Sequence, residues 1–239
     1  MKQVYDDSCL PQGFSAAGTY SGLCDSRVRL DLAMIVSRTN CSIVVSSAQG
    51  VWQSAGKALL LHNGAALPEG LRGQEIQQEV CSAASQYLAI GAQDVAFVAS
   101  GVKGQHFRPS RLIDSLETLG ASLSPSHGAQ VGAVIDNLGD MTDSAVSLGS
   151  GSVHMNGMAA DGTEAKPGLC ILTTDAAATP QQLRDALAAC TGAINTEGYT
   201  IIALANGMAS EPVGGASLAQ AMKRTMLQLG FQPALQACS

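Results

Sequence analysis

Three segments of the chain carry side chains that could perform nucleophilic or acyl-transfer chemistry. Ser100 and Gly101 follow a buried apolar run, and Thr163 follows a turn-forming Asp-Gly pair. A serine or threonine hydroxyl can attack a carbonyl once a base activates it. Cys170 is a third candidate, but a reactive thiol needs an electropositive, partly open setting. Its apolar neighbours predict a buried packing residue instead.

Both hydroxyl positions also have a purely structural interpretation. Ser100 and Gly101 fit equally well a strand-to-helix turn that uses glycine for its backbone freedom, and on such a turn Ser100 would be half-exposed. Thr163 fits a solvated turn, because Asp-Gly is a strong turn signal, and we favour that interpretation. The chain contains no G-x-S-x-G nucleophile motif.

The composition limits the classes of protein that the chain can represent. It has 239 residues, of which 46% are hydrophobic and 13% charged, with a net charge of −6. This suits one α/β domain over residues 1–239, with a loose joint at 208–216. Clustered Lys and Arg are absent, so we expect no nucleic-acid partner. No apolar run could span a bilayer and the N-terminus lacks a signal h-region, so we expect no membrane association and a cytoplasmic location.

Cysteine and histidine spacing gives no sign of a metal site or of a disulfide framework. The seven cysteines include no CxxC pair, and the four histidines are scattered. We therefore expect reduced, mostly buried thiols and surface or hydrogen-bonded histidines, with no metal and no cofactor. The residues concerned are Cys9, Cys24, Cys41, Cys81, Cys170, Cys190, Cys238, His62, His106, His127 and His154.

The hydrophobic pattern predicts alternating strands and helices, interrupted by a hairpin. Strands are expected at 28–37, 41–47, 56–64, 94–101, 169–174 and 199–207, with a hairpin over 144–159 that turns at 149–151. Helices are expected at 73–91, 108–120, 128–139, 179–194 and 215–230, the fourth with Thr179 as its N-cap and proline at its first position. Together they predict a mixed, layered α/β fold rather than a purely parallel Rossmann sheet.

Six segments, taken in order, resemble the ornithine acetyltransferase family, also called bifunctional glutamate N-acetyltransferase, of arginine biosynthesis. They read GFSAAGTYSGL, DLAMIVS, QDVAFVASGVKGQ, ASLSPS, ILTTDA and ALANG, and they extend from near residue 11 to near residue 230. The resemblance implies an ornithine-acetyltransferase-like α/β sandwich. It also implies acetyl transfer from N-acetylornithine to glutamate, carried by a threonine that self-cleavage exposes.

The chain departs from the family at several working positions. Ser100 and Gly101 match a Thr-Gly oxyanion element, whereas Ala160 stands where the substrate-binding lysine is expected. Pro167 stands where the nucleophilic threonine is expected, and it has no hydroxyl. The family's acidic run before ALANG is absent from 194–207, and we expect its final domain to be missing.

These departures predict an inactive relative that keeps the scaffold and does not cleave itself. Its ligand would be an N-acyl amino acid, but we expect no binding of N-acetylornithine or N-acetylglutamate, because Ala160 has replaced the cation that would hold the carboxylate. Its partner would be a second copy or a longer family member, because loss of a domain exposes apolar surface. The alternative is an active acyltransferase that moves an acetyl group between N-acetylornithine and glutamate, with a site rebuilt around Ser100 and Thr163.

Overall fold

The computed structural model describes residues 10–23, 30–136, 142–148 and 152–234 of the chain. Within these ranges strands and helices alternate in the order expected of a mixed α/β protein. The elements are β1 (Phe14–Thr19), β2 (Leu32–Ser47), β3 (Gly50–His62), α1 (Leu71–Leu88), η1 (Ala92–Asp94), β4 (Val95–Ala99), α2 (Pro109–Asp114), α3 (Leu116–Ala121), α4 (Gly128–Ile135), β5 (Thr142–Leu148), β6 (Val153–Ala160), β7 (Gly168–Thr174), α5 (Pro180–Thr191), β8 (Tyr199–Ala205) and α6 (Gly215–Gln228).

The strands form one eight-stranded sheet in the order β4-β3-β2-β8-β7-β6-β5, with β1 paired to β2 off this path. The long strand β2 serves both halves of the sheet. Its residues 32–36 pair with β1 and β3, whereas residues 42–46 pair with β3 and β8. Two pairs, β3–β4 and β7–β8, are parallel and the others are antiparallel. The predicted mixed α/β class is therefore confirmed.

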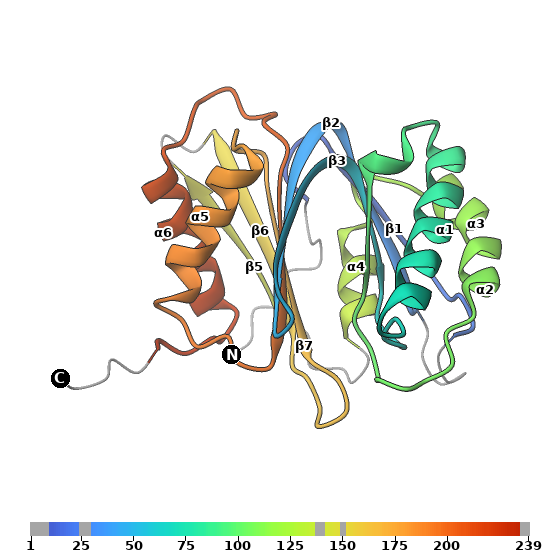
Figure 1. Cartoon of the computed structure of the whole chain (residues 1–239). Coiled ribbons are helices and arrows are strands. Elements are labelled where there is room, and N and C mark those ends of the chain that lie inside the picture. Colours follow the sequence, from blue (N-terminus) through green and yellow to red (C-terminus); the bar gives the residue numbers. More distant parts are fainter. Residues whose placement is uncertain (1–9, 24–29, 137–141, 149–151, 235–239) are drawn as a thin grey trace.

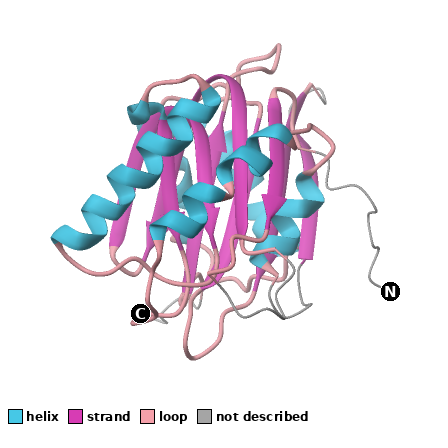
Figure 2. Cartoon of the chain, turned by 90° about the vertical axis from the view of Figure 1, so that its right-hand side faces the viewer, coloured by secondary structure: helices cyan, strands magenta, loops and turns pink. Residues whose placement is uncertain are grey.

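Helices and the two halves of the sheet form layers (Figure 1). Helices α1, α2 and α3 cover one outer face, and α5 and α6 cover the other. Helix α4 lies between the two halves of the sheet, where its Val131, Val134 and Ile135 join the central core. Separate buried clusters fill the spaces under α5 and α6 and under α1 to α3. In Figure 2 the strands run side by side behind helices α1, α2 and α3.

Local signals placed α5 correctly. Thr179 Oγ1 accepts a hydrogen bond from the Gln182 amide at 3.2 Å, and Gln182 Oε1 accepts one from the Thr179 amide at 2.9 Å. This reciprocal capping box begins the helix at Pro180, whose missing N–H costs nothing at that position. The buried stripe of the helix, Leu183, Ala186, Leu187 and Cys190, then packs on the sheet.

Three strand predictions were wrong in their boundaries. The strand expected at 56–64 is β3, which begins earlier, at Gly50. The strands expected at 28–37 and 41–47 are one strand, β2, with an irregularity between Val36 and Cys41. A bulge bends a strand without ending it, and here it lets β2 pass from one half of the sheet to the other. Strand β1 was not predicted, because its sequence FSAAGT has few large apolar residues.

Three helix predictions also need correction. The helix expected at 108–120 is two short helices that meet at Ser115, whose hydroxyl donates to the Arg111 carbonyl. The helix expected at 73–91 ends at Leu88, where Ala89 adopts a left-handed conformation with φ of 52°. The helix expected at 128–139 ends earlier, at Ile135, because Asp136 leaves the helical conformation. The predicted turn at 149–151 and the strand start at 28–29 lie outside the described residues.

None of the helices in the described ranges is long and apolar enough to cross a membrane.

Candidate active site

The segment that contains Ser100 and Gly101 is held against the chain that follows β3. The Ser100 amide donates to the His62 carbonyl at 2.8 Å, and the Val102 amide donates to the Gly64 carbonyl at 2.9 Å. The Ala66 amide donates in turn to the Val102 carbonyl at 3.2 Å. The turn after β4 is therefore fixed by backbone pairing.

The loop between β6 and β7 reaches the same end of the sandwich. Lys166 Nζ donates to Asn63 Oδ1 at 3.4 Å. Asn63 is buried, and its Nδ2 donates to the carbonyls of Val134 and Ile135, each at 2.9 Å. Residues 62–66 thus contact both the Ser100 turn and the loop that carries Thr163.

Ser100 is buried, with only 4% of its surface exposed. The half-exposed turn expected there was wrong, because pairing with residues 62–66 covers it. Within the described residues its Oγ has no hydrogen-bond partner. Buried hydroxyls normally have one. The Gly101 amide also lacks an acceptor among the hydrogen bonds of the described residues, so two neighbouring donors are unused.

Gly101 is required by close backbone approach and not by its own conformation. Its φ is outside the left-handed region that favours glycine. A Cβ atom added there would lie 2.2 Å from the carbonyl carbon of Gly64 and 2.4 Å from the amide nitrogen of Ala65. Our expectation that a positive φ explains this glycine is therefore not met.

A buried polar group beneath the turn was not found by sequence reasoning. The ring Nδ1 of His62 contacts the Asp31 carbonyl at 2.8 Å, and its Nε2 accepts from the Ala65 amide at 3.1 Å. An Nε2 that accepts leaves the proton on Nδ1, which is the neutral tautomer. Burial lowers the pKa of His62, although the nearby Asp31 opposes this. The Asp31 carboxylate accepts from the Ser21 hydroxyl at 2.9 Å.

An open pocket of about 650 Å³ lies over the β6–β7 loop. It is lined by residues 161–167, by residues 197–199 and by Lys103, which follows the Ser100 turn. Lys103 and Lys166 bring positive charge to it. Asp161, Glu164 and Glu197 bring negative charge, and Tyr199 donates its phenolic hydroxyl to Asp161 Oδ1. Burial and this hydrogen bond raise the pKa of Tyr199.

Thr163 lies in the solvated turn that its sequence predicts. Its amide donates to the Lys166 carbonyl at 2.9 Å, and its Oγ1 accepts from the Ala165 amide at 3.3 Å. The side chain is exposed. Among the described residues, no acid or base side chain makes a hydrogen bond to it. Thr163 and Lys103 nevertheless line the same pocket.

The two positions where the family's lysine and threonine are expected flank this loop. Ala160 ends β6, is 6% exposed and pairs with Leu169 of β7. Pro167 directly precedes β7 and is exposed. The loop therefore enters β7 through a residue that has neither a hydroxyl nor an ionisable group.

The described cysteines and histidines do not form a reactive cluster. Cys41, Cys81, Cys170 and Cys190 are free and buried, which confirms Cys170 as a packing residue. Burial, with a smaller effect of Cys190, raises the pKa of the Cys170 thiol. In the described part of the chain, no three His, Cys, Asp or Glu side chains gather as a metal site would require. Cys9, Cys24 and Cys238 lie outside it.

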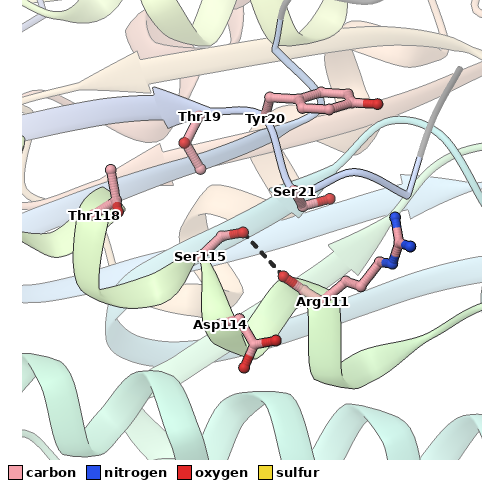
Figure 3. A pocket seen from close by; sticks show the side chains of 7 residues that line it. All are labelled: Thr19, Tyr20, Ser21, Arg111, Asp114, Ser115 and Thr118. Carbon is pink, nitrogen blue, oxygen red and sulfur yellow. Dashed lines mark hydrogen bonds between the residues drawn. The ribbon is translucent and has the colours of Figure 1, made fainter. Parts of the chain in front are cut away.

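A second, smaller pocket of about 360 Å³ was not predicted (Figure 3). Its lining is mostly hydroxyl-bearing and comes from the end of β1 and from α2 and α3. Arg111 donates to the Gly22 carbonyl at 2.8 Å and so closes one side of it. Ser21 lines this pocket and also binds Asp31, beneath the Ser100 turn.

The fold is similar to that of proteins of known structure. A β-aminopeptidase from Burkholderia sp. aligns over 96% of this chain and 87% of its own, with a TM-score of 0.53 and 10% identity. An ornithine acetyltransferase from Mycobacterium tuberculosis, solved in complex with ornithine, aligns over 64% of this chain and 84% of its own, with a TM-score of 0.46 and 16% identity. No protein-family model matches the chain.

The relatives found by sequence similarity share one more specific name, ArgJ. The chloroplastic arginine biosynthesis bifunctional protein ArgJ of Zea mays is 26% identical over 240 residues, which cover 87% of this chain and 52% of the relative. ArgJ 1 of Streptomyces clavuligerus is 25% identical, covering 89% of this chain and 62% of its own length. The resemblance to the ornithine acetyltransferase family is thereby confirmed, and the chain is similar to ArgJ proteins over most of its length. It spans about half the length of the plant relative.

Proposed function

We propose that this ArgJ-like chain binds an N-acyl amino acid without transferring its acyl group. The observation that carries this proposal is the pair of unused donors at the turn after β4, Ser100 Oγ–H and the Gly101 amide. Both belong to a turn fixed by backbone hydrogen bonds. An acyl carbonyl oxygen is the kind of acceptor that such a pair suits. The Oγ is buried and neither residue lines the two described pockets, so binding requires this turn to open towards the ligand.

The two lysines of the neighbouring pocket support a ligand with a carboxylate, although Asp161, Glu164 and Glu197 line the same pocket. Ala160 offers no cation, but Lys103 and Lys166 both line the pocket beside it. Lys166 is also fixed by Asn63 at 3.4 Å. The loss of the expected lysine is thus offset by two others at the same end of the fold.

The absence of transfer is supported by the chemistry of the β6–β7 loop. Self-cleavage and acyl transfer need a hydroxyl or amine that can attack a carbonyl. Pro167 has neither, and Thr163 is exposed in a turn where its oxygen accepts from Ala165. Neither residue is paired with a base among the described residues.

A second candidate function is acyl transfer between N-acetylornithine and glutamate by a rebuilt site. It is favoured by one observation, that Thr163 and Lys103, two residues beyond Gly101, line one pocket. In this case Thr163 would be the nucleophile and the Ser100 turn would stabilise the intermediate. Turnover that is lost in Thr163→Ala would support it.

The rest of the proposal concerns the domain organisation, the partner and the cellular location of the protein. We regard residues 1–239 as one ArgJ-like domain. It associates with a second copy of itself or with a longer family member. No cofactor is needed for binding of this kind. The cytoplasm is the proposed location, since four buried free thiols suit a reducing compartment.

Titration calorimetry tests the ligand and the residue together. N-acetylornithine and N-acetylglutamate are titrated into wild type, Ser100→Ala and the exposed control Ser110→Ala. We expect saturable binding of at least one compound. Ser100→Ala should weaken it by about 0.5–1.5 kcal/mol, the net value of one hydrogen bond, and Ser110→Ala should leave it unchanged. No binding to wild type, or equal binding in all three proteins, would refute the proposed site.

A further inference from the structure

His62 joins two backbone segments beneath the Ser100 turn. It is the last residue of β3 and is fully buried. Its ring contacts the carbonyl oxygen of Asp31 through Nδ1, at 2.8 Å, and accepts a hydrogen bond from the Ala65 amide through Nε2, at 3.1 Å. The ring also packs edge-on against Phe107, with 5.6 Å between the ring centroids. The imidazole is therefore held from three sides.

The segment that His62 binds is the one that covers the Ser100 turn. Residues 64–66 pair with Val102 through two backbone hydrogen bonds, of 2.9 Å and 3.2 Å. The contact is close, because a Cβ atom added at Gly101 would lie only 2.2 Å from the backbone of this segment. The position of residues 64–66 therefore decides whether Ser100 is covered.

The hydrogen bond from Ala65 needs a neutral imidazole. An Nε2 atom that accepts carries no proton, so the single N–H of the ring is on Nδ1, where the Asp31 carbonyl can accept it. In the imidazolium ion both nitrogens are donors. Its Nε2–H would face the Ala65 N–H, and two buried donors without an acceptor are unfavourable. Because Nδ1–H keeps its acceptor on the other side of the ring, residues 64–66 are the part that moves.

The groups around His62 determine the pH at which this movement occurs. Among the described residues, one charged side chain acts on the imidazole, the Asp31 carboxylate, and it favours protonation. The nearest cation of the β6–β7 loop, Lys166, contacts the residue that follows His62. The neighbours on β2, on β4 and before α2 are uncharged, namely Leu32, Ala99 and Phe107. Burial outweighs Asp31 and lowers the pKa of His62 below its ordinary value of 6.5, so the movement occurs in acid.

We propose that His62 is a proton-sensitive contact that keeps the Ser100 turn covered. The neutral imidazole holds residues 64–66 against the turn, and protonation moves them away and uncovers Ser100 and Gly101. The uncovered form binds one proton more than the covered form, so a fall in pH favours it. The inference concerns the movement of the turn and does not depend on the proposed ligand.

Hydrogen exchange of the free protein measures this movement. After correction for the intrinsic effect of pH on exchange, protection of the Ala65, Ala66 and Val102 amides should fall at least about tenfold between pH 6.5 and pH 5, because one linked proton changes an equilibrium by up to about tenfold per pH unit. The amides of Ile202 and Ala203 in β8 should keep their protection, since the fold as a whole stays intact. Unchanged protection at the turn, or an equal loss in β8, would overturn the proposal.

Two variants separate His62 from other groups that titrate in acid. His62→Gln replaces the imidazole by an amide that is neutral at every pH and can both donate and accept. In this variant the corrected exchange of Ala66 and Val102 should no longer depend on pH. The control His106→Gln changes an exposed histidine beside Phe107 and should keep the wild-type behaviour. A pH dependence that persists in His62→Gln, or that His106→Gln removes, would contradict the assignment.

A further measurement on the wild-type protein keeps the proposal testable if His62→Gln does not fold. In an NMR titration the imidazole signals of His62 and the amide signal of Val102 should change with the same midpoint, while the amide signals of β8 remain those of the folded protein. A shared midpoint supports the proposal. Different midpoints, or a Val102 signal that does not respond when His62 is protonated, would overturn it.

Discussion

Lys166 of the β6–β7 loop lies with its Nζ 3.4 Å from Oδ1 of Asn63, a buried residue that follows β3. This contact joins the loop in which the family's nucleophile is expected to the segment that fixes the Ser100 turn. It also places a cation at the end of the fold where Ala160 supplies none. The same end therefore has donors that suit a carbonyl on one segment, and the Lys166 cation together with Asp161 and Glu164 on the other.

Replacing Lys166 should weaken ligand binding through lost charge. We expect Lys166→Met to lower the affinity for an N-acetyl amino acid about fivefold to tenfold, which is about 1–1.4 kcal/mol. Calorimetry at two salt concentrations measures this, since screening should reduce the wild-type affinity towards that of the variant. Lys223→Met, at an exposed position on α6, is the matched control. Equal affinities in Lys166→Met and wild type would show that this cation plays no part.

Adding a single methyl group at Gly101 should destabilise the fold. Its Cβ would meet the Gly64 carbonyl carbon at 2.2 Å, so the backbone must move, at a cost of about 2–3 kcal/mol. Urea unfolding of Gly101→Ala measures this loss. The control Gly120→Ala has no atom within 4 Å of its Cβ and lies in helix α3. It should be neutral or slightly stabilising, and a similar loss in both variants would contradict the contact.

Removing the Ser100 hydroxyl should affect binding without affecting stability. The buried Oγ has no partner within the described residues, so its removal leaves no other group unsatisfied. We expect Ser100→Ala to change the free energy of unfolding by less than about 1 kcal/mol. A larger loss, measured by urea unfolding, would mean that the hydroxyl supports the fold through a bond that the described residues do not contain.

The stability of the protein should fall in mild acid because His62 is buried in its neutral form. Burial lowers its pKa below the ordinary value of 6.5. As the pH falls below 6.5, the unfolded chain binds a proton at this histidine that the folded chain does not. The free energy of unfolding therefore decreases by up to about 1.4 kcal/mol per pH unit, until the pH reaches the folded pKa.

NMR titration of the imidazole signals isolates this residue from the carboxylates that also respond to acid. The His62 signal is assigned by comparison with His62→Gln. At pH 6.5 it should be that of the neutral imidazole protonated at Nδ1, and its chemical shift should change only below this pH. Titration of His62 at or above pH 6.5 would contradict the buried neutral tautomer and the stability loss derived from it.

Local sequence patterns predicted most of the helices and strands, but not that the single strand β2 pairs in both halves of the sheet. Thr179 and Pro180 specified the start of α5 because capping depends on residues close in sequence. The irregularity after Val36 looked like a gap between strands. Only pairing with β1 on one half and β8 on the other shows that β2 is continuous.

The sequence located residues of the candidate site but did not predict the contacts that hold them in place. Ser100 and Thr163 were identified, yet the burial of Ser100 depends on pairing with residues 62–66, and Lys166 meets Asn63 across 103 residues of chain. Such long-range contacts leave no periodic signal. Gly101 shows the same limit, because a glycine needed for positive φ and one needed for close approach look identical in sequence.

Acylation of the protein itself tests the central claim, binding without transfer, most directly. Wild-type protein is incubated with N-acetylornithine and glutamate, and its intact mass is followed together with the formation of N-acetylglutamate. We predict one uncleaved chain of unchanged mass and no N-acetylglutamate above the rate without protein, because Pro167 offers no nucleophile and Thr163 has no base. A chain that gains one acetyl group on Thr163, fragments that end near Ala165 or Gly162, or steady product formation lost in Thr163→Ala would contradict the account.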